Sequence, residues 1–326
     1  MGQTYLFITC TLSLGAIGFT VYERFLQATG KTMFSTLSQV IGALINILLD
    51  YVFIYICNWG VAGAAYATVI GQFASLIVAM LLHYLTNKEI NGSLVYLKPS
   101  SSIIKGIYMI GLPAAIMQAL LSVMMLGMNL ILGTCSTNTE LIQGTFGIYF
   151  KIQQFALFAA FGLSNTLITL TSFNYGMKNK ERVTDTLKYG IINSIIISLS
   201  ITILFEALAG PLSKLFGMTS DSGEEIINSR TIAIRIAAIG YVFMGISISI
   251  QGVMQALRYT CKPLLISLCR LVIFVFPVAY LFTLSPNAIT LVWWTFPISE
   301  GITAIISLIL IINVYKTKIM TISSVK

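Results

Sequence analysis

The stretch MFSTLSQVIGALINILLDYVFIYI, from Met33 to Ile56, decides the fold class of this chain. Asp50 is the only charged residue within it. An α-helix needs about 20 consecutive apolar residues to cross a bilayer, whereas a strand of a membrane barrel needs only about 10 residues of alternating polarity. Because the stretch is long and lacks that alternation, it predicts a membrane-spanning helix.

The composition of the whole chain agrees with this prediction. Of its 326 residues, 57% are hydrophobic and 9% are charged, and the mean hydropathy is +0.90. A soluble domain carries about 25% charged residues. The composition therefore excludes a soluble enzyme, a disordered chain and a secreted disulfide scaffold, and it predicts an all-α polytopic membrane protein.

The hydropathy pattern predicts about nine transmembrane helices. The fourth and fifth apolar segments are longer than a bilayer requires, so we expect them to tilt, kink or extend beyond the lipid. The nine segments are Thr4–Tyr22, Met33–Ile56, Val61–Leu82, Ile103–Leu132, Ile142–Phe173, Leu187–Ala209, Thr231–Leu257, Pro263–Leu284 and Ile289–Val314.

The charge pattern predicts the orientation of these helices. The net charge is +8, and most of the 19 Lys and Arg residues fall in alternate loops and in the C-terminal tail. Cytoplasmic loops are enriched in Lys and Arg, so we expect a cytoplasmic C-terminus, an outer Met1 and no nucleic-acid partner. A start on the outside, directly against a span, predicts an odd number of further helices upstream.

Two segments of the chain resemble each other. The residues from Phe25 onward, which include Gln27 and Ala28, are similar to those from Val253 onward, which include Gln255 and Ala256 at an offset of 228 residues. Parallel internal repeats are typical of transporters. Chance similarity between two apolar segments is the alternative.

Several motifs in series resemble the MATE (multidrug and toxic compound extrusion) transporters. They are ERFLQATGKTMFSTLSQVIGALINILLDYVFIY from Glu23, GVAGAAYATVIGQ from Gly60, GLPAAIMQALLSVM from Gly111, GIYFKIQQFALFAAFGLSNTLITLTSFNYG from Gly147 and VWWTFPISEGITAIISL from Val292. The resemblance covers nearly the whole chain. It implies a twelve-helix transporter fold of two six-helix lobes, in which residues 1–98 are the second half of the N-terminal lobe (three helices) and residues 99–326 are the C-terminal six-helix lobe.

The resemblance also implies a function. It predicts a secondary active antiporter in the cell membrane that exports amphipathic or cationic drugs and toxins in exchange for H⁺ or Na⁺. It implies no enzymatic activity, no cofactor besides the coupling ion, and no obligate protein partner beyond the surrounding lipid bilayer. The alternative is a lipid-linked oligosaccharide flippase of a related fold. Because half of the first lobe is absent, we expect the 326-residue chain to transport nothing alone.

The sequence departs from the family pattern in ways that leave the coupling ion open. Tyr51 stands where the family often has Pro, and Leu257 and Arg258 follow the Gln-Ala pair where the family often has Gly. The family's acid on the first helix is missing. The helices Ile103–Leu132 and Thr231–Leu257, which would carry further acids, contain neither Asp nor Glu.

Charged residues inside the spans are the first candidates for ion coupling, because charge at membrane depth is costly and usually faces a cavity or a partner. We favour Glu300, three residues after the helix-bending Pro297, and expect Lys151 or Arg235 beside it. The alternative is a static ion pair that only fixes helix packing. The full set of candidates is Glu300, Asp50, Lys151, Arg235 and Arg270, with Glu206 close to the outer boundary.

Polar and aromatic residues at helical spacing are candidates for a transport cavity. Lys151, Phe155 and Phe158 begin one face of the fifth segment, which continues through Gly162, Asn165 and Thr169. From the spacing alone, the core of the bundle is the better interpretation of these aromatic residues. The complete set of cavity candidates is Asn46, Gln118, Asn129, Gln154, Phe155, Phe158 and Asn165.

Overall fold

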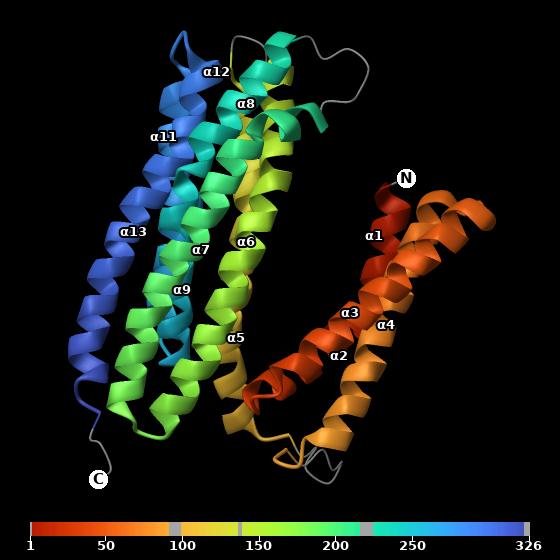
Figure 1. Cartoon of the computed structure of the whole chain (residues 1–326), viewed down its shortest axis with the longest axis vertical. Helices are drawn as coiled ribbons and strands as arrows, with labels where there is room; N and C mark the ends of the chain where they lie inside the picture. Colours follow the sequence, from red (N-terminus) through yellow and green to blue (C-terminus); the bar gives the residue numbers. More distant parts are fainter. Residues whose placement is uncertain (1, 91–98, 136–138, 216–223, 323–326) are drawn as a thin grey trace. The chain divides into compact units, whose positions relative to one another are not determined.

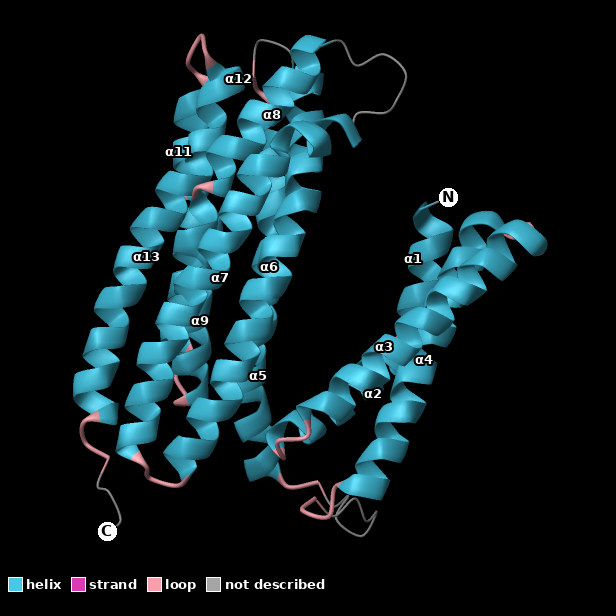
Figure 2. Cartoon of the chain, viewed as in Figure 1, coloured by secondary structure: helices cyan, strands magenta, loops and turns pink. Residues whose placement is uncertain are grey.

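The computed structural model describes residues 2–90, 99–135, 139–215 and 224–322, except for the side chain of residue 225. Within these ranges the regular structure is entirely helical (Figure 2). Among the described residues, eight helices are long and apolar enough to span a membrane, and there are nine if the bent pair α1 (Gly2–Thr11) and α2 (Leu14–Ala28) forms one span. The predicted all-α membrane fold is confirmed.

The chain divides into two compact units, Met1–Lys98 and Pro99–Lys326 (Figure 1). The division falls at the boundary expected from the sequence. That the units are half of one lobe and the whole of a second lobe stays a prediction.

Unit 1 is built around α4 (Gly60–Thr86), which packs against α1, α2 and α3 (Thr32–Asp50). A π-helical turn, η1 (Tyr51–Ile56), extends α3 to the connection with α4. The axes of α1 and α2 differ in direction by 53°.

Glycine allows α3 and α4 to approach closely. A Cβ atom added at Gly42 would lie 2.6 Å from the carbonyl oxygen of Gly71, and one added at Gly71 would lie 2.8 Å from that of Gly42. A Cβ atom at Gly63 would meet the backbone of Phe53 at 3.0 Å. Glycine residues therefore serve helix packing here.

Unit 2 is a bundle in which α9 occupies the centre and packs against α6, α7 and α13. Its long helices run in alternating directions, so α6, α9 and α13 point the same way (Figure 1). The elements are α5 (Ser101–Gly133), α6 (Thr139–Gly176), α7 (Lys180–Leu215), α8 (Glu224–Ala238), α9 (Gly240–Ala256), α10 (Cys261–Leu268), η3 (Cys269–Ile273), α11 (Val275–Thr283), α12 (Ala288–Leu291), η4 (Val292–Trp294), α13 (Thr295–Val314) and η5 (Tyr315–Ile319).

The last two spans of unit 2 are interrupted next to their proline residues. The π-helical turn η3 ends four residues before Pro277, and the 3₁₀ turn η4 ends just before the first turn of α13, which holds Pro297. Proline cannot donate a backbone hydrogen bond and its ring crowds the preceding turn, which disfavours regular α-helical winding there. Pro297 thus lies at the start of a helix rather than at a bend within one.

The backbone supports the internal repeat. After α2, the amides of Thr29, Gly30 and Lys31 donate to the carbonyls of Phe25, Gln27 and Leu26. After α9, the amides of Leu257, Arg258 and Tyr259 donate to Val253, Gln255 and Met254, each of which lies 228 residues beyond its counterpart. Gly30 and Arg258 both adopt positive φ, at +77° and +64°.

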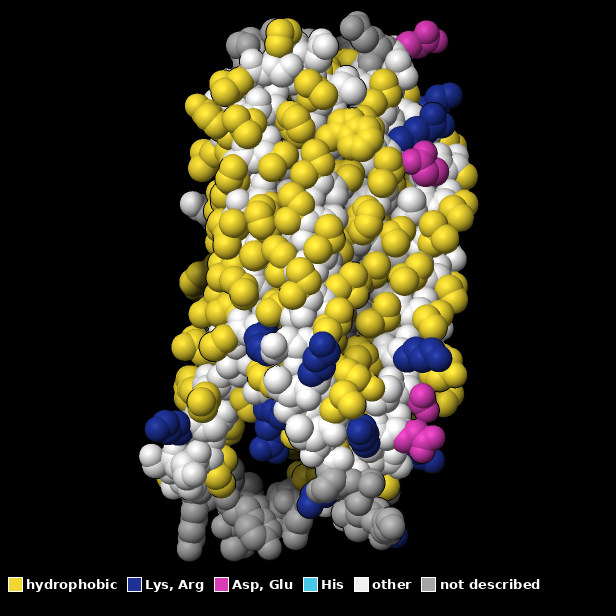
Figure 3. Space-filling view, turned by 90° about the vertical axis from the view of Figure 1, so that its left-hand side faces the viewer, with side chains coloured by type: hydrophobic (Ala, Val, Ile, Leu, Met, Phe, Trp, Pro, Cys, Tyr) yellow, Lys and Arg dark blue, Asp and Glu magenta, His cyan; other side chains and the backbone are white. Residues whose placement is uncertain are grey.

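The surface agrees with a membrane environment. On the face shown in Figure 3, hydrophobic side chains cover most of the height, and Lys and Arg side chains gather in the lower part, toward the end where the C-terminus lies. A broad apolar band bordered by basic residues is typical of a protein surrounded by lipid.

The shared turn predicts opposite effects of two substitutions. Gly30→Ala should lower the free energy of unfolding by about 1 kcal/mol, because a Cβ atom strains a left-handed residue, and Arg258→Gly should raise it by about the same amount. Thermal unfolding in detergent measures both. Shifts in the same direction would contradict the shared backbone motif.

The close contact between α3 and α4 predicts that Gly42→Val destabilises unit 1 by about 1–3 kcal/mol, because the added side chain meets the backbone of α4. Gly106→Val is the matched control, since a Cβ atom there has nothing within 4 Å. Equal unfolding midpoints of the two variants would show that α3 and α4 can move apart without loss of stability.

Candidate functional site

A buried ion pair lies inside unit 2. The Arg270 Nε atom of η3 is 3.4 Å from the Glu300 Oε1 atom of α13, and the two side chains are 5% and 9% exposed. Desolvating two charges is costly, and the cost is offset only when the charges neutralise each other. At membrane depth such a pair marks a candidate functional site.

The local backbone places these two side chains. Arg270 lies in the π-helical turn that precedes Pro277, and Glu300 lies in the second turn of α13, after the 3₁₀ turn η4. Both charges therefore sit next to irregular winding. Single π-turns within α-helices occur frequently at functional sites.

The partner of Glu300 differs from the one expected. The sequence suggested Lys151 or Arg235, but Lys151 lies on the exposed side of α6 and Arg235 pairs with Glu206 of α7. The partner is instead Arg270, whose side chain meets that of Glu300 at one depth. The expectation failed because span boundaries do not specify how far a long Arg side chain reaches along the bundle.

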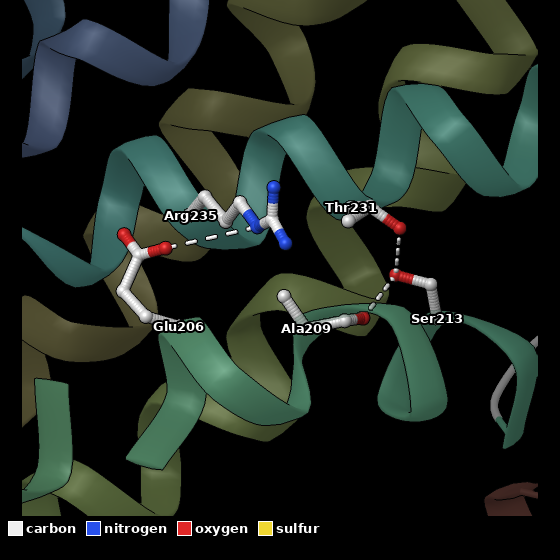
Figure 4. A network of polar contacts seen from close by, with 5 residues as sticks. All are labelled: Glu206, Ala209, Ser213, Thr231 and Arg235. Carbon is white, nitrogen blue, oxygen red and sulfur yellow. Dashed lines mark hydrogen bonds and ion pairs between the residues drawn. The ribbon is translucent and has the colours of Figure 1, made fainter. Parts of the chain in front are cut away.

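The second ion pair has a different setting. Arg235 Nε of α8 is 3.7 Å from Glu206 Oε2, and their side chains are 58% and 39% exposed. Figure 4 shows this pair beside a chain of hydroxyl groups, in which Thr231 donates to Ser213 over 3.0 Å and Ser213 donates to the carbonyl of Ala209 over 2.7 Å. This network connects α7 to α8, with the ion pair exposed and Ser213 buried.

The aromatic residues of α6 are on its exposed side. Phe155 is 65% exposed and Phe158 is 67% exposed, so the interpretation of these side chains as bundle core is wrong. Lys151 and Gly162 are exposed on the same helix, and Gln154 and Asn165 are partly buried. We call the exposed row Lys151, Phe155, Phe158 and Gly162 the outer face of α6.

The outer face borders an apolar groove between α6 and α7. The groove has a volume of about 350 Å³. Its lining is formed by Ile152, Phe155, Ile201, Leu204, Phe205, Leu212 and Leu215.

The two candidates on α5 are separate from the ion pair. Gln118 is exposed, and the side-chain amide of Asn129 donates to the carbonyl of Met125 over 2.9 Å. The side chain of Asn129 therefore bonds to the backbone of its own helix, α5.

Unit 1 contains its own polar cavity, between α2, α3 and α4. Its volume is about 280 Å³. Asn46 lines it with Gln39, Gln72, Thr68 and Ser75 among others. Asp50, one turn further along α3, does not line this cavity, although its Oδ1 atom is buried without a described hydrogen-bond partner.

The internal repeat relates the two units at the site. Counting back 228 residues from Arg270 and Glu300 leads to Gly42 and Gln72. In unit 1 these positions provide a close helix contact and a neutral amide, whereas in unit 2 they provide opposite charges. Of the two units, only unit 2 therefore has charged residues at these equivalent positions.

Two buried tyrosines of unit 2 were missed in the sequence. Tyr149 of α6 and Tyr241 of α9 are 1% and 2% exposed, and neither hydroxyl has a hydrogen-bond partner among the described residues. The signal for Tyr149 was its spacing from Thr145 and Gln153, which puts three polar residues on one face of α6.

These features define a multi-pass helical membrane protein with a buried, internally neutral charge pair. The chain belongs to the MatE family, whose profile matches residues 113–281. It is 25% identical over 294 residues to the "Multidrug export protein MepA" of Staphylococcus haemolyticus, and 24% identical to that of Staphylococcus aureus. These matches cover 90% of this chain and 63% of each relative, so the chain spans less than two thirds of their length.

Solved structures show the same fold. A MOP superfamily transporter from Pyrococcus furiosus superposes with a TM-score of 0.88 at 24% identity, over 97% of this chain and 70% of that chain. An outward-facing multidrug resistance MATE family transporter gives the same score and identity over 96% and 70%. The expected fold and family are confirmed.

The burial of the ion pair predicts non-additive effects on stability. Arg270→Met should destabilise unit 2 by about 3–5 kcal/mol, because it leaves the Glu300 carboxylate buried without a partner, and adding Glu300→Leu should restore most of that loss. Thermal unfolding in detergent measures this. Arg235→Met is the control on the exposed pair and should have a smaller effect; a double variant no more stable than Arg270→Met would contradict the ion pair.

Proposed function

We propose that this chain forms most of a secondary active antiporter that exports amphipathic, often cationic organic compounds in exchange for H⁺ or Na⁺. The Arg270–Glu300 pair is the observation that carries the proposal. An ion can drive transport only if it binds one conformation better than another. A buried carboxylate held against a guanidinium provides such a difference, because binding of a cation or proton to Glu300 removes the charge that balances Arg270.

The names of the relatives support drug export as the transported class. The outer face of α6 and the adjoining groove offer aromatic rings and aliphatic side chains, which bind apolar groups and, through the ring faces, cations. Lys151 on the same face opposes the binding of a cation. We therefore expect compounds whose apolar surface outweighs their charge.

The flippase alternative has less support. A site for a pyrophosphate group needs several unpaired cations. Of the three basic residues among the charged candidates, Arg270 and Arg235 each face an acid, which leaves Lys151.

We further propose that the C-terminus is cytoplasmic and that the protein resides in the cell membrane. The basic residues at the C-terminal end of the bundle support this orientation, because Lys and Arg are retained on the cytoplasmic side.

The test is dye efflux by this chain extended with three upstream helices from a MepA relative. Glu300→Gln should abolish ethidium export at unchanged membrane levels, because the amide cannot alternate between charged and neutral forms. Glu206→Gln, in the exposed pair, is the matched control and should export normally. Normal efflux by Glu300→Gln would remove Glu300 from the mechanism.

A further inference from the structure

A cluster of basic and aromatic side chains lies at the end of unit 2 where α6, α9 and α13 end (Figure 1). The proposed function gives this cluster no role. We call it the basic cluster; it consists of Tyr175 in the last turn of α6, Arg258 and Tyr259 in the turn after α9, Lys262 of α10, Asn313 of α13 and Lys318 of η5. Tyr175 belongs to it because its ring centroid is 5.7 Å from the Lys318 Nζ atom.

The ring of Tyr259 brings two ammonium groups close together. The Nζ atom of Lys262 is 4.5 Å from the centroid of this ring, and that of Lys318 is 4.6 Å from the same centroid. Each ammonium group also donates a hydrogen bond, Lys262 to Asn313 Oδ1 over 3.2 Å and Lys318 to the carbonyl of Leu257. Cation–π contacts and hydrogen bonds thus hold both side chains in place. Because an ammonium group has three N–H donors, further donors remain for a ligand.

Acidic residues do not balance the charges of the cluster. From Ile226 to the end of the sequence, Glu300 is the only acidic residue, and it pairs with Arg270. In the part of the chain that the structure describes, neither Lys262 nor Lys318 forms an ion pair. Two like charges against one ring repel each other, and an anion bound between them offsets this repulsion. The basic cluster therefore favours an anionic ligand.

The backbone at Arg258 indicates a role for its side chain. Arg258 has a φ of +64°, a left-handed conformation that strains a residue with a Cβ atom, and its equivalent in unit 1 is Gly30. Strained residues of this kind cluster at functional positions, where the side chain compensates for the strain. The Arg258 side chain is exposed and lies in the same turn as Tyr259. It therefore provides a third positive charge for the same ligand.

Exposed apolar side chains lead from the cluster along the bundle. Asn313, Ile309 and Ile305 recur at every fourth position of α13, so they share one face of the helix. Asn313 is exposed, and Ile309 and Ile305 are 62% and 61% exposed. On α10, Leu265 lies three residues after Lys262 and is 44% exposed. Because Lys262 bonds to Asn313, both apolar rows begin at the cluster, and a ligand bound there lies next to surface on which a hydrocarbon chain can pack.

We propose that the basic cluster binds the phosphate headgroup of an anionic phospholipid, with an acyl chain along Ile309 and Ile305. Hydrogen bonds from ammonium and guanidinium groups to phosphate oxygens are strong because both partners are charged. Basic pockets between transmembrane helices bind anionic headgroups in this way. A free phosphate ion would satisfy the same charges but would leave the apolar rows unused. The inference goes beyond the proposed function, because it depends neither on the transported compound nor on the coupling ion.

The experiment is a titration of the 326-residue chain in a neutral detergent with dioleoyl phosphatidylglycerol, followed by native mass spectrometry and thermal unfolding. Phosphatidylglycerol should form a one-to-one adduct and raise the unfolding midpoint. Dioleoyl phosphatidylcholine has the same chains without net charge, and glycerol 3-phosphate is an anionic phosphate without chains, so neither should have these effects. Lys262→Gln should weaken the binding of phosphatidylglycerol about fivefold, the contribution of one basic residue to the binding of anionic lipid.

Arg258→Gly separates binding from folding. It relieves the strained turn, so without lipid this variant should be at least as stable as the wild type, yet it should bind phosphatidylglycerol about fivefold more weakly.

Lys188→Gln is the matched control, because Lys188 of α7 also lies over a tyrosine ring, 5.7 Å from the centroid of Tyr189, but outside the basic cluster. This variant should bind phosphatidylglycerol with the affinity of the wild type. The inference is overturned if phosphatidylglycerol forms no adduct, or if phosphatidylcholine or glycerol 3-phosphate binds as tightly as phosphatidylglycerol does. It is also overturned if Arg258→Gly and Lys262→Gln both keep the wild-type affinity, or if Lys188→Gln loses as much affinity as they do.

Discussion

The absence of water in the hydrocarbon core is the constraint on which this structure depends. Backbone amides and carbonyls there must bond to each other, so the described chain is helical almost throughout. The same constraint applies to charged side chains, which cannot be hydrated in the hydrocarbon core. Arg270 and Glu300 are buried together because each supplies the counter-charge that water cannot. A change in the protonation of one partner then becomes a change in the energy of the whole bundle, which is what an ion-coupled transporter requires.

The two units use one backbone plan for different purposes. The turns after α2 and α9 have three equivalent backbone hydrogen bonds, and a residue with positive φ lies at the same position in each turn. Where unit 1 has Gly42, α3 and α4 pack backbone to backbone, and where unit 2 has Arg270, a π-helical turn accommodates a long charged side chain. Unit 1 thus keeps a neutral polar cavity, and unit 2 holds the charge pair.

The two sides of α6 have different surroundings. Tyr149 and Gln153 are buried in the bundle, while Phe155 and Phe158 lie on the exposed side, where Phe155 lines an apolar groove. One helix thus has buried polar groups on one side and exposed aromatic rings on the other. The distinction requires only the 100° rotation between successive residues of a helix.

The sequence alone determined the helical membrane fold and the approximate spans, and it indicated the repeat, because these follow from apolar length and spacing. It could not identify Arg270 as the partner of Glu300, because a helix pattern does not say which neighbour faces a given side chain. For the same reason it placed Phe155 and Phe158 in the core and passed over Tyr149 and Tyr241. Only the tertiary structure decided these points, since burial and pairing depend on how α6, α9, η3 and α13 are rotated against one another.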